Sequence, residues 1–293
     1  MSAITILCSC AADSKTESDK LSITTTIYPY YEFVREIVGN KAQINQLISP
    51  GTEIHEFEPT PKDILKINNS DIFIYNGGES DEWVDKVLNS INSDVKVMCM
   101  FDYADLLYEE DIEHNKGDEY DEHIWTSIEN DKKFVKAISE QILKLDSANA
   151  DFYKSNTDAY INKLSRLDNS FENLVQNSSR NTIVVADRFP ILYFVKEYGI
   201  KYESAFPGCT SETQPSIKTV TKLIDYVREN DLPVVFHIDN SSESLARIIC
   251  EDSNAEIMTF YSMHNITREQ FESKTTFISL LELNLKSLKE ALE

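Results

Sequence analysis

The residues best suited to chemistry in this chain are two histidines that lie among carboxylates. His55 occurs in Gly51–Asp63, GTEIHEFEPTPKD, and His123 occurs in YDEHIW, directly after two carboxylates and before a tryptophan. A neutral imidazole is a common metal ligand, and a nearby carboxylate can accept the proton of its second nitrogen and thereby fix its tautomer. Each histidine alone is equally typical of an ordinary loop, so its meaning depends on the fold that positions it.

The composition narrows the classes of function. The chain has 293 residues, and 28 Lys and Arg stand against 50 Asp and Glu, giving a net charge of −22. Phosphate contacts need Lys and Arg, so this balance argues against nucleic acid as a partner. A cationic cargo would suit the charge, although solubility in an extracellular setting explains it more simply. With only seven glycines, Gly-rich phosphate loops are disfavoured. Neither HExxH nor GxSxG occurs, so the motifs give no support to a hydrolase.

The first residues indicate a lipoprotein. Met1–Cys10 reads MSAITILCSC, in which Leu7–Cys10 forms a loose lipobox, and the polar run Ala11–Lys20 would be a flexible tether. We therefore expect an extracytoplasmic protein that is lipid-anchored to the cell membrane at Cys10. The basic n-region of a signal peptide is missing and the apolar run is too short to span a membrane, so a chance apolar start is the alternative. A Cys209–Cys250 disulfide is left open by the sequence.

Elsewhere, strands alternate with helices in both halves of the chain, a pattern that predicts α/β lobes with parallel sheets. The predicted strands are Leu21–Tyr28, Ala42–Ile48, Asp71–Tyr75, Val95–Met100, Thr182–Ala186, Pro233–Ile238 and Glu256–Phe260. The predicted helices include Tyr30–Val38, Pro61–Ile67, Trp83–Ile91, Ile191–Tyr198, Ile217–Glu229, Ser244–Cys250 and Phe277–Leu292.

Between the two halves, Lys132–Gln176 is almost entirely helical in pattern and contains neither Gly nor Pro. The fold class expected is therefore α/β, with two parallel-sheet lobes joined by a long, rigid linking helix. The expected divisions are a signal remnant and tether at 1–20, a first lobe at 21–145, the linking helix at 146–180 and a second lobe at 181–293. A rigid link would limit hinge motion between the lobes.

Two motifs carry a resemblance to a known family. His55–Asp63, HEFEPTPKD, resembles the pattern H-x-[FY]-E-P-[TS]-P-x-D that holds the first ligand histidine in the zinc- and manganese-type solute-binding proteins of ABC importers. Asp121–Trp125, DEHIW, resembles their D-P-H-x-W, with Glu122 in place of proline. Shorter matches are Thr26–Pro29, Tyr75–Gly78, and Phe206–Gly208 followed by Pro215–Ser216, so the resemblance spans Leu21–Leu292.

The resemblance implies a monomeric metal receptor rather than an enzyme. Two lobes would hold the metal in a cleft between them, with His55 and His123 as ligands from the first lobe. The cargo would be a divalent transition metal that the receptor captures and delivers to the membrane permease of an ABC importer.

In the second lobe the sequence departs from the family pattern. Arg188 stands where the third ligand, His or Glu, is usual, and Tyr261 stands where an Asp usually provides the fourth. Arginine stays protonated and cannot bind a metal. Glu212, on a loop that faces the cleft in family members, and His264, just after the late strand, are the expected replacements. His55, His123, Glu212 and His264 then form a tetrahedral set that favours zinc, with manganese as the alternative.

Other polar residues near these positions have simpler interpretations. His237 lies between Phe236 and Ile238, which favours a core histidine, while Asp239 ends the same strand. Asp187 and Arg188 would form an ion pair, or Arg188 would hold Glu212. In the acidic loop Glu109–Glu122, His114 would either be solvated or recruit metal weakly.

Two other functions remain open at this stage. One is a surface adhesion lipoprotein that has lost or altered metal binding, which the changes at Arg188 and Tyr261 keep in play. The other is a metallohydrolase in which His55 and His123 hold a metal-bound water and Glu58 acts as base.

Overall fold

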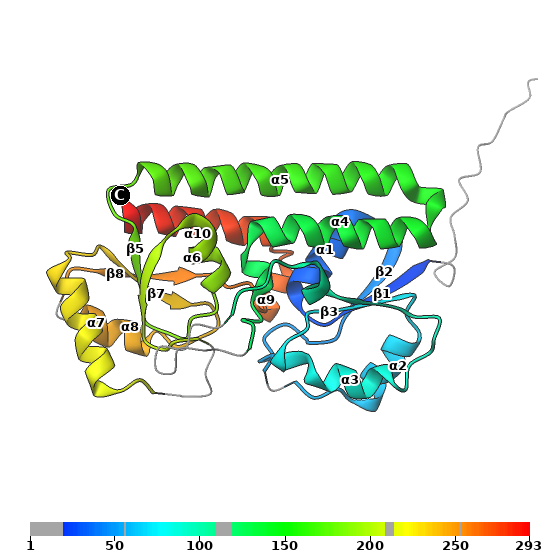
Figure 1. The fold of residues 1–293 in the computed structure, drawn as a ribbon, viewed down its shortest axis with the longest axis horizontal. Helices are drawn as coiled ribbons and strands as arrows, with labels where there is room; N and C mark the ends of the chain where they lie inside the picture. The colour runs from blue at the N-terminus through cyan, green and yellow to red at the C-terminus, as the bar shows by residue number, and fades with distance from the viewer. Residues whose placement is uncertain (1–19, 56, 109–118, 209–213, 252) are drawn as a thin grey trace, which may run out of the picture.

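The computed structural model describes residues 20–55, 57–108, 119–208, 214–251 and 253–293. Within them the chain forms two four-stranded sheets, with strand orders β2-β1-β3-β4 and β6-β5-β7-β8. Every strand pairing in both sheets is parallel. The two sheets therefore have the same order of strands along the chain, and the predicted pair of parallel α/β lobes is confirmed (Figure 1).

The first lobe follows the predicted alternation closely. Its elements are β1 (Leu21–Thr25), α1 (Tyr28–Val38), β2 (Ala42–Gln46), α2 (Pro61–Asn68), β3 (Ile72–Tyr75), α3 (Glu82–Leu88) and β4 (Lys96–Cys99). The first strand is shorter than predicted, because Pro29 stands in the first turn of α1, where its missing N–H costs no hydrogen bond. Helix α2 starts at a capping box in which Thr60 and Asp63 satisfy each other's backbone N–H groups.

The second lobe repeats the plan and adds elements that the sequence pattern did not reveal. Its elements are β5 (Thr182–Val185), α6 (Leu192–Tyr198), β6 (Lys201–Ser204), α7 (Ile217–Glu229), β7 (Val234–Ile238), α8 (Ser244–Cys250), β8 (Glu256–Phe260), α9 (Arg268–Glu272) and α10 (Phe277–Leu292). Strand β6 and helix α9 were not predicted. Both are short, and β6 is an edge strand of polar composition, so neither carries a strong periodic signal.

Two helices replace the single helical run expected between the lobes. Helix α4 spans Ile128–Leu145 and helix α5 spans Ala150–Asn177. The break lies at Asp146, whose carboxylate accepts hydrogen bonds from Asn149 Nδ2 and from the Tyr153 hydroxyl. Such local side-chain bonds compete with helix continuation. The 28-residue α5 runs along both lobes, beside α4 and α10 (Figure 1).

The two lobes share one continuous core. A single cluster of buried apolar residues includes Ile23 and Ile74 of the first sheet and Val185 and Phe260 of the second. Helix α10 of the second lobe packs against α1 of the first, where the Phe277 and Phe33 rings lie 5.1 Å apart. Opening the lobes would expose this apolar surface, which supports the expected restriction of hinge motion.

The loops that follow the strands face the junction between the lobes. In parallel α/β sheets, ligands bind outside the carboxyl ends of the strands. His55 follows β2, Ser80 follows β3 and His264 follows β8, so three separate strand ends supply side chains to one region. Within the described residues, no helix is long and apolar enough to cross a membrane.

Candidate metal centre

Three histidines from three segments meet at the lobe junction. His55, His123 and His264 each offer a ligand nitrogen, and these atoms all lie within 4.8 Å of one another. The His264 ring lies 4.9 Å from the His55 ring and 5.1 Å from the His123 ring, centroid to centroid. The Nε2 atoms of all three are buried. A cluster of converging imidazole nitrogens of this size is suited to a transition metal such as zinc.

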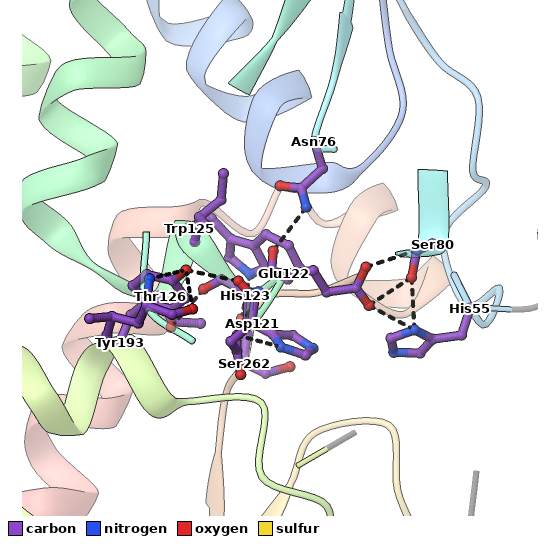
Figure 2. A network of polar contacts seen from close by, with 12 residues as sticks. His55, Asn76, Ser80, Asp121, Glu122, His123, Trp125, Thr126, Tyr193 and Ser262 are labelled. Carbon is purple, nitrogen blue, oxygen red and sulfur yellow. Dashed lines mark hydrogen bonds and ion pairs between the residues drawn. The ribbon is translucent and has the colours of Figure 1, made fainter. Parts of the chain in front are cut away.

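His123 is held rigidly by its own segment. Its Nδ1 lies 3.0 Å from Asp121 Oδ1, and the same oxygen accepts the His123 backbone N–H at 2.8 Å (Figure 2). The side chain is 1% exposed. A carboxylate accepts hydrogen bonds and donates none, so its contact with Nδ1 requires the Nδ1–H tautomer of His123. The lone pair of the ring then lies on Nε2. The orientation of this ring toward the cluster is therefore set before any metal arrives.

His55 is oriented by residues from elsewhere in the first lobe. Its Nδ1 lies 3.0 Å from Glu122 Oε1 and 2.8 Å from the Ser80 hydroxyl (Figure 2). Ser80 in turn donates its hydroxyl proton to Glu122 at 2.7 Å. The His55 side chain is 24% exposed and that of His123 is 1% exposed, so His55 lies nearer to solvent than His123.

His264 is carried by a constrained turn after β8. Met263, just before it, adopts a left-handed φ of 58°, which turns the chain sharply. Ser262 donates its backbone N–H and its hydroxyl to Asp239 at 2.7 and 2.8 Å. The Trp125 indole donates to Ser262 O at 2.9 Å, and its ring lies 5.0 Å from that of His264. Trp125 belongs to the first lobe, so the His123 segment also supports His264 in the second lobe.

A second bridge joins the loop before His55 to the turn after His264. Asn265 Nδ2 donates to Ser49 O at 2.9 Å and to Thr52 O at 2.8 Å. Gly51 N donates to Ile266 O at 2.8 Å. Gly51 has a φ of 80°, which glycine adopts without strain. These bonds fix the relative positions of His55 and His264, which are more than 200 residues apart in the sequence.

The electrostatics of the site favour a neutral His264 and an ionised Glu122. Burial lowers the pKa of His264 well below its ordinary value, and the neighbouring His123, His55 and Arg188 lower it further. Burial alone would raise the pKa of Glu122, but the hydrogen bond with His55 and the neighbouring histidines bring it down to about 2. A metal ion needs deprotonated ligands, and the lowered pKa favours the neutral form of His264 that could bind one.

Beside the cluster lies a cavity of about 310 Å³ between the lobes, the predicted cleft. His55 and His264 line it together with Arg188, Asp187 and Asp239. The Asp187 carboxylate accepts the backbone N–H of Arg188 at 2.8 Å. In the part of the chain that the structure describes, no ion pair joins the side chains of Asp187 and Arg188, so this alternative is wrong. The other alternative, that Arg188 holds Glu212, lies outside the described residues.

The remaining predicted residues divide into three groups. Glu212, His114, Cys10 and Cys209 lie outside the described residues, while Cys250 has a free thiol. His237 is 7% exposed on β7 and contacts the Thr259 hydroxyl at 2.9 Å, as a core histidine would. The backbone N–H and O of Tyr261 are both hydrogen-bonded to the Asn284 side chain.

Sequence reasoning missed the part played by Glu122. It identified Glu122 only as a substitute for proline, and Ser80 was not singled out. The sequence offered one signal for this role: Glu122 stands directly before His123 in an acidic loop. Its contact with His55, 67 residues earlier, depends on the packing of two strand-end loops, which the local sequence does not show.

Two parallel α/β lobes with converging histidines at their junction define a metal-binding protein of the two-lobed solute-receptor type. The comparisons with known proteins identify the family. The model of the family described as "Zinc-uptake complex component A periplasmic" matches residues 23–291, and the chain belongs to this family. The family consists of uptake receptors and is not a family of enzymes.

Two curated relatives are similar along nearly the whole chain. The high-affinity zinc uptake system protein ZnuA of Bacillus subtilis is 30% identical over 291 residues, covering 96% of this chain and 90% of that protein. The zinc-binding lipoprotein AdcA of Streptococcus pneumoniae is 30% identical over 290 residues, 95% of this chain. The chain spans 57% of the length of AdcA.

A solved structure has the same fold. The zinc-bound ZnuA-like domain of Streptococcus pneumoniae AdcA superposes with a TM-score of 0.78 at 28% sequence identity. The match covers 93% of this chain and 99% of that domain. The ZnuA-like domain of AdcA thus corresponds to nearly all of the present chain.

Proposed function

We propose that this protein is an extracytoplasmic receptor that captures a divalent transition metal, zinc in preference to manganese, and delivers it to the membrane permease of an ABC importer. The observation that carries the proposal is the convergence of three histidine nitrogens within 4.8 Å at the lobe junction. The family membership and the zinc-binding names of the relatives support zinc as the cargo.

His55, His123 and His264 are the proposed protein ligands. Imidazole nitrogen suits zinc, whereas manganese prefers carboxylate and water oxygens. Glu212 is proposed as the fourth ligand, and its oxygen would complete the usual tetrahedral coordination. With Arg188 and Tyr261 at the usual positions for the third and fourth ligands, the second lobe would use His264 and Glu212 in their place.

We also propose where the receptor is located and that it is monomeric. Cys10 would carry a lipid that anchors a monomeric receptor to the outer face of the cell membrane, close to its permease. The AdcA relative is named as a lipoprotein, which supports an anchor. Intact-mass analysis of the native protein, together with membrane fractionation, tests this point: an unmodified and freely soluble chain would contradict it.

Zinc titration of histidine variants tests the binding site. In competition with a chelator, the double variant His55→Ala and His123→Ala should lose high-affinity zinc binding. Its melting temperature should no longer rise with zinc, because a ligand that binds only the native state stabilises it by mass action. His237→Ala is the matched control, since it removes a histidine outside the cluster, and it should keep the zinc affinity. Equal zinc-induced shifts in wild type and the double variant would contradict the proposed site.

A further inference from the structure

The contacts around Glu122 give it a role in metal binding beyond that of a charged neighbour. Its carboxylate accepts the Ser80 backbone N–H at 2.9 Å and the Ser80 hydroxyl at 2.7 Å, and it lies 3.0 Å from His55 Nδ1. Its backbone oxygen accepts a hydrogen bond from Asn76 Nδ2 at 2.8 Å. Glu122 is therefore fixed at both its backbone and its side chain, and the residue is 7% exposed.

Proton counting defines the tautomer of His55. The Ser80 hydroxyl has one proton, and it is donated to Glu122. The ionised carboxylate of Glu122 only accepts. Both neighbours of His55 Nδ1 therefore present lone pairs to it, and the contacts at 2.8 and 3.0 Å require a proton on Nδ1. The lone pair of His55 then resides on Nε2, the nitrogen that the cluster needs.

The turn after β3 is shaped to receive Glu122. Gly78 has a φ of 85°, and a Cβ there would lie 2.8 Å from Glu122 Cβ and 3.2 Å from Glu122 Oε2. Asp81 holds the same turn by accepting the backbone N–H groups of Asn76 and Gly77 at 2.8 and 3.1 Å. The close approach of Glu122 thus requires the absence of a side chain at Gly78.

We propose that Glu122 is a positioning residue for the metal: it holds His55 as the Nδ1–H tautomer, directs Nε2 to the metal, and supplies negative charge behind a neutral imidazole. The inference rests on the proposed function. Asp121 has the corresponding contact with His123. Two of the three proposed histidine ligands would therefore be supported by carboxylates from the adjacent residues Asp121 and Glu122. Outer partners of this kind typically change metal affinity 10- to 100-fold when removed.

The test compares zinc affinities of full-length variants in competition with a chelator. Glu122→Ala should bind zinc about 10- to 100-fold more weakly than wild type. Glu122→Gln keeps an acceptor oxygen for Nδ1–H but loses the charge, so its zinc affinity should lie between those of wild type and Glu122→Ala. Glu79→Gln is the control, because Glu79 is exposed, carries the same charge and is next to Ser80. Its zinc affinity should stay within about threefold of wild type. This is a change of under about 1 kcal/mol, because a tenfold change corresponds to about 1.4 kcal/mol.

A spectroscopic measurement separates positioning from folding. The visible absorption of the cobalt-loaded protein should change in Glu122→Ala, because His55 would no longer be held toward the metal, and it should resemble wild type in Glu122→Gln. A Glu122→Ala variant that binds zinc within about threefold of wild type, or no more weakly than Glu79→Gln, would overturn the inference. If Glu122→Ala does not fold, Glu122→Gln must bind more weakly than Glu79→Gln, or the inference fails. Absence of zinc binding by wild type would instead contradict the proposed function itself.

Discussion

Replacing Asn265 with Ala tests whether the two lobes hold the metal ligands in a preformed arrangement. Asn265 follows His264, and its side chain donates hydrogen bonds to Ser49 O and Thr52 O, in the loop that leads to His55. The substitution removes both bonds, and also the bond that Asn265 Oδ1 accepts from Ile266 N at 2.9 Å, without changing any proposed ligand. The loop and the turn would then be joined mainly through the bond from Gly51 N to Ile266 O.

The expected cost follows from the number of bonds lost. A hydrogen bond between neutral groups contributes about 0.5–1.5 kcal/mol net, so the three bonds lost amount to about 1.5–4.5 kcal/mol. If about half of this free energy is lost again in ordering the ligands when the metal binds, the zinc affinity should fall about three- to fortyfold, since 1.4 kcal/mol corresponds to a factor of ten. The remainder should appear as a lower free energy of unfolding of the metal-free protein.

Two assays read these quantities separately. Chelator competition gives the zinc affinity, and urea unfolding of the metal-free protein gives the stability. Asn89→Ala is the matched control, because Asn89 is exposed and its side chain bonds only to Asp85 O within its own helix end. An Asn265→Ala variant that loses stability but binds zinc within twofold of wild type would refute the reasoning. Its bonds would then support the fold without positioning the ligands.

Two other substitutions test the lobe junction and the shared core. Trp125→Phe removes the indole bond to Ser262 O but keeps a buried ring, so stability measured by urea unfolding should fall by about 1 kcal/mol and zinc should bind more weakly. Burial raises the pKa of Glu32 from 4.5 to about 7, although Arg35 opposes the shift. Because the folded state holds this proton more tightly than the unfolded state, the contribution of Glu32 to stability should fall as the pH rises from about 4.5 to about 7. Glu32→Gln should weaken that dependence and be more favourable, relative to wild type, at pH 8 than at pH 5; an unchanged difference in unfolding free energy at the two pH values would contradict the assignment.

Much of the fold was predictable because its signals are local. The boundaries of α7, α8, β8 and α10 agree with the sequence prediction, since each has clear periodicity and well-defined ends. The helical pattern of Lys132–Gln176 did not show the break between α4 and α5, although the break lies at the predicted division between 145 and 146. Asp146 interrupts the helix through side-chain bonds, while the apolar spacing continues across it.

The site was predictable only in part, for a physical reason. His55 and His123 lie in motifs that the local sequence displays. His264 was proposed because the usual ligands are absent from the second lobe, and the structure places it beside both first-lobe histidines. The proposed role of Glu122 depends on the distance between two segments, the loop after β2 that carries His55 and the segment before α4. Local sequence does not encode such a distance, so the sequence showed Glu122 beside His123 but did not show its contact with His55.

X-ray absorption at the zinc edge of the zinc-loaded protein tests the central claim most directly. We expect a four-coordinate zinc with three imidazole nitrogens at about 2.0–2.1 Å and one oxygen, without sulfur. His264→Ala should lose one imidazole while retaining those of His55 and His123. A wild-type spectrum with fewer than two imidazoles, or an unchanged imidazole count in His264→Ala, would contradict a metal site shared by the two lobes.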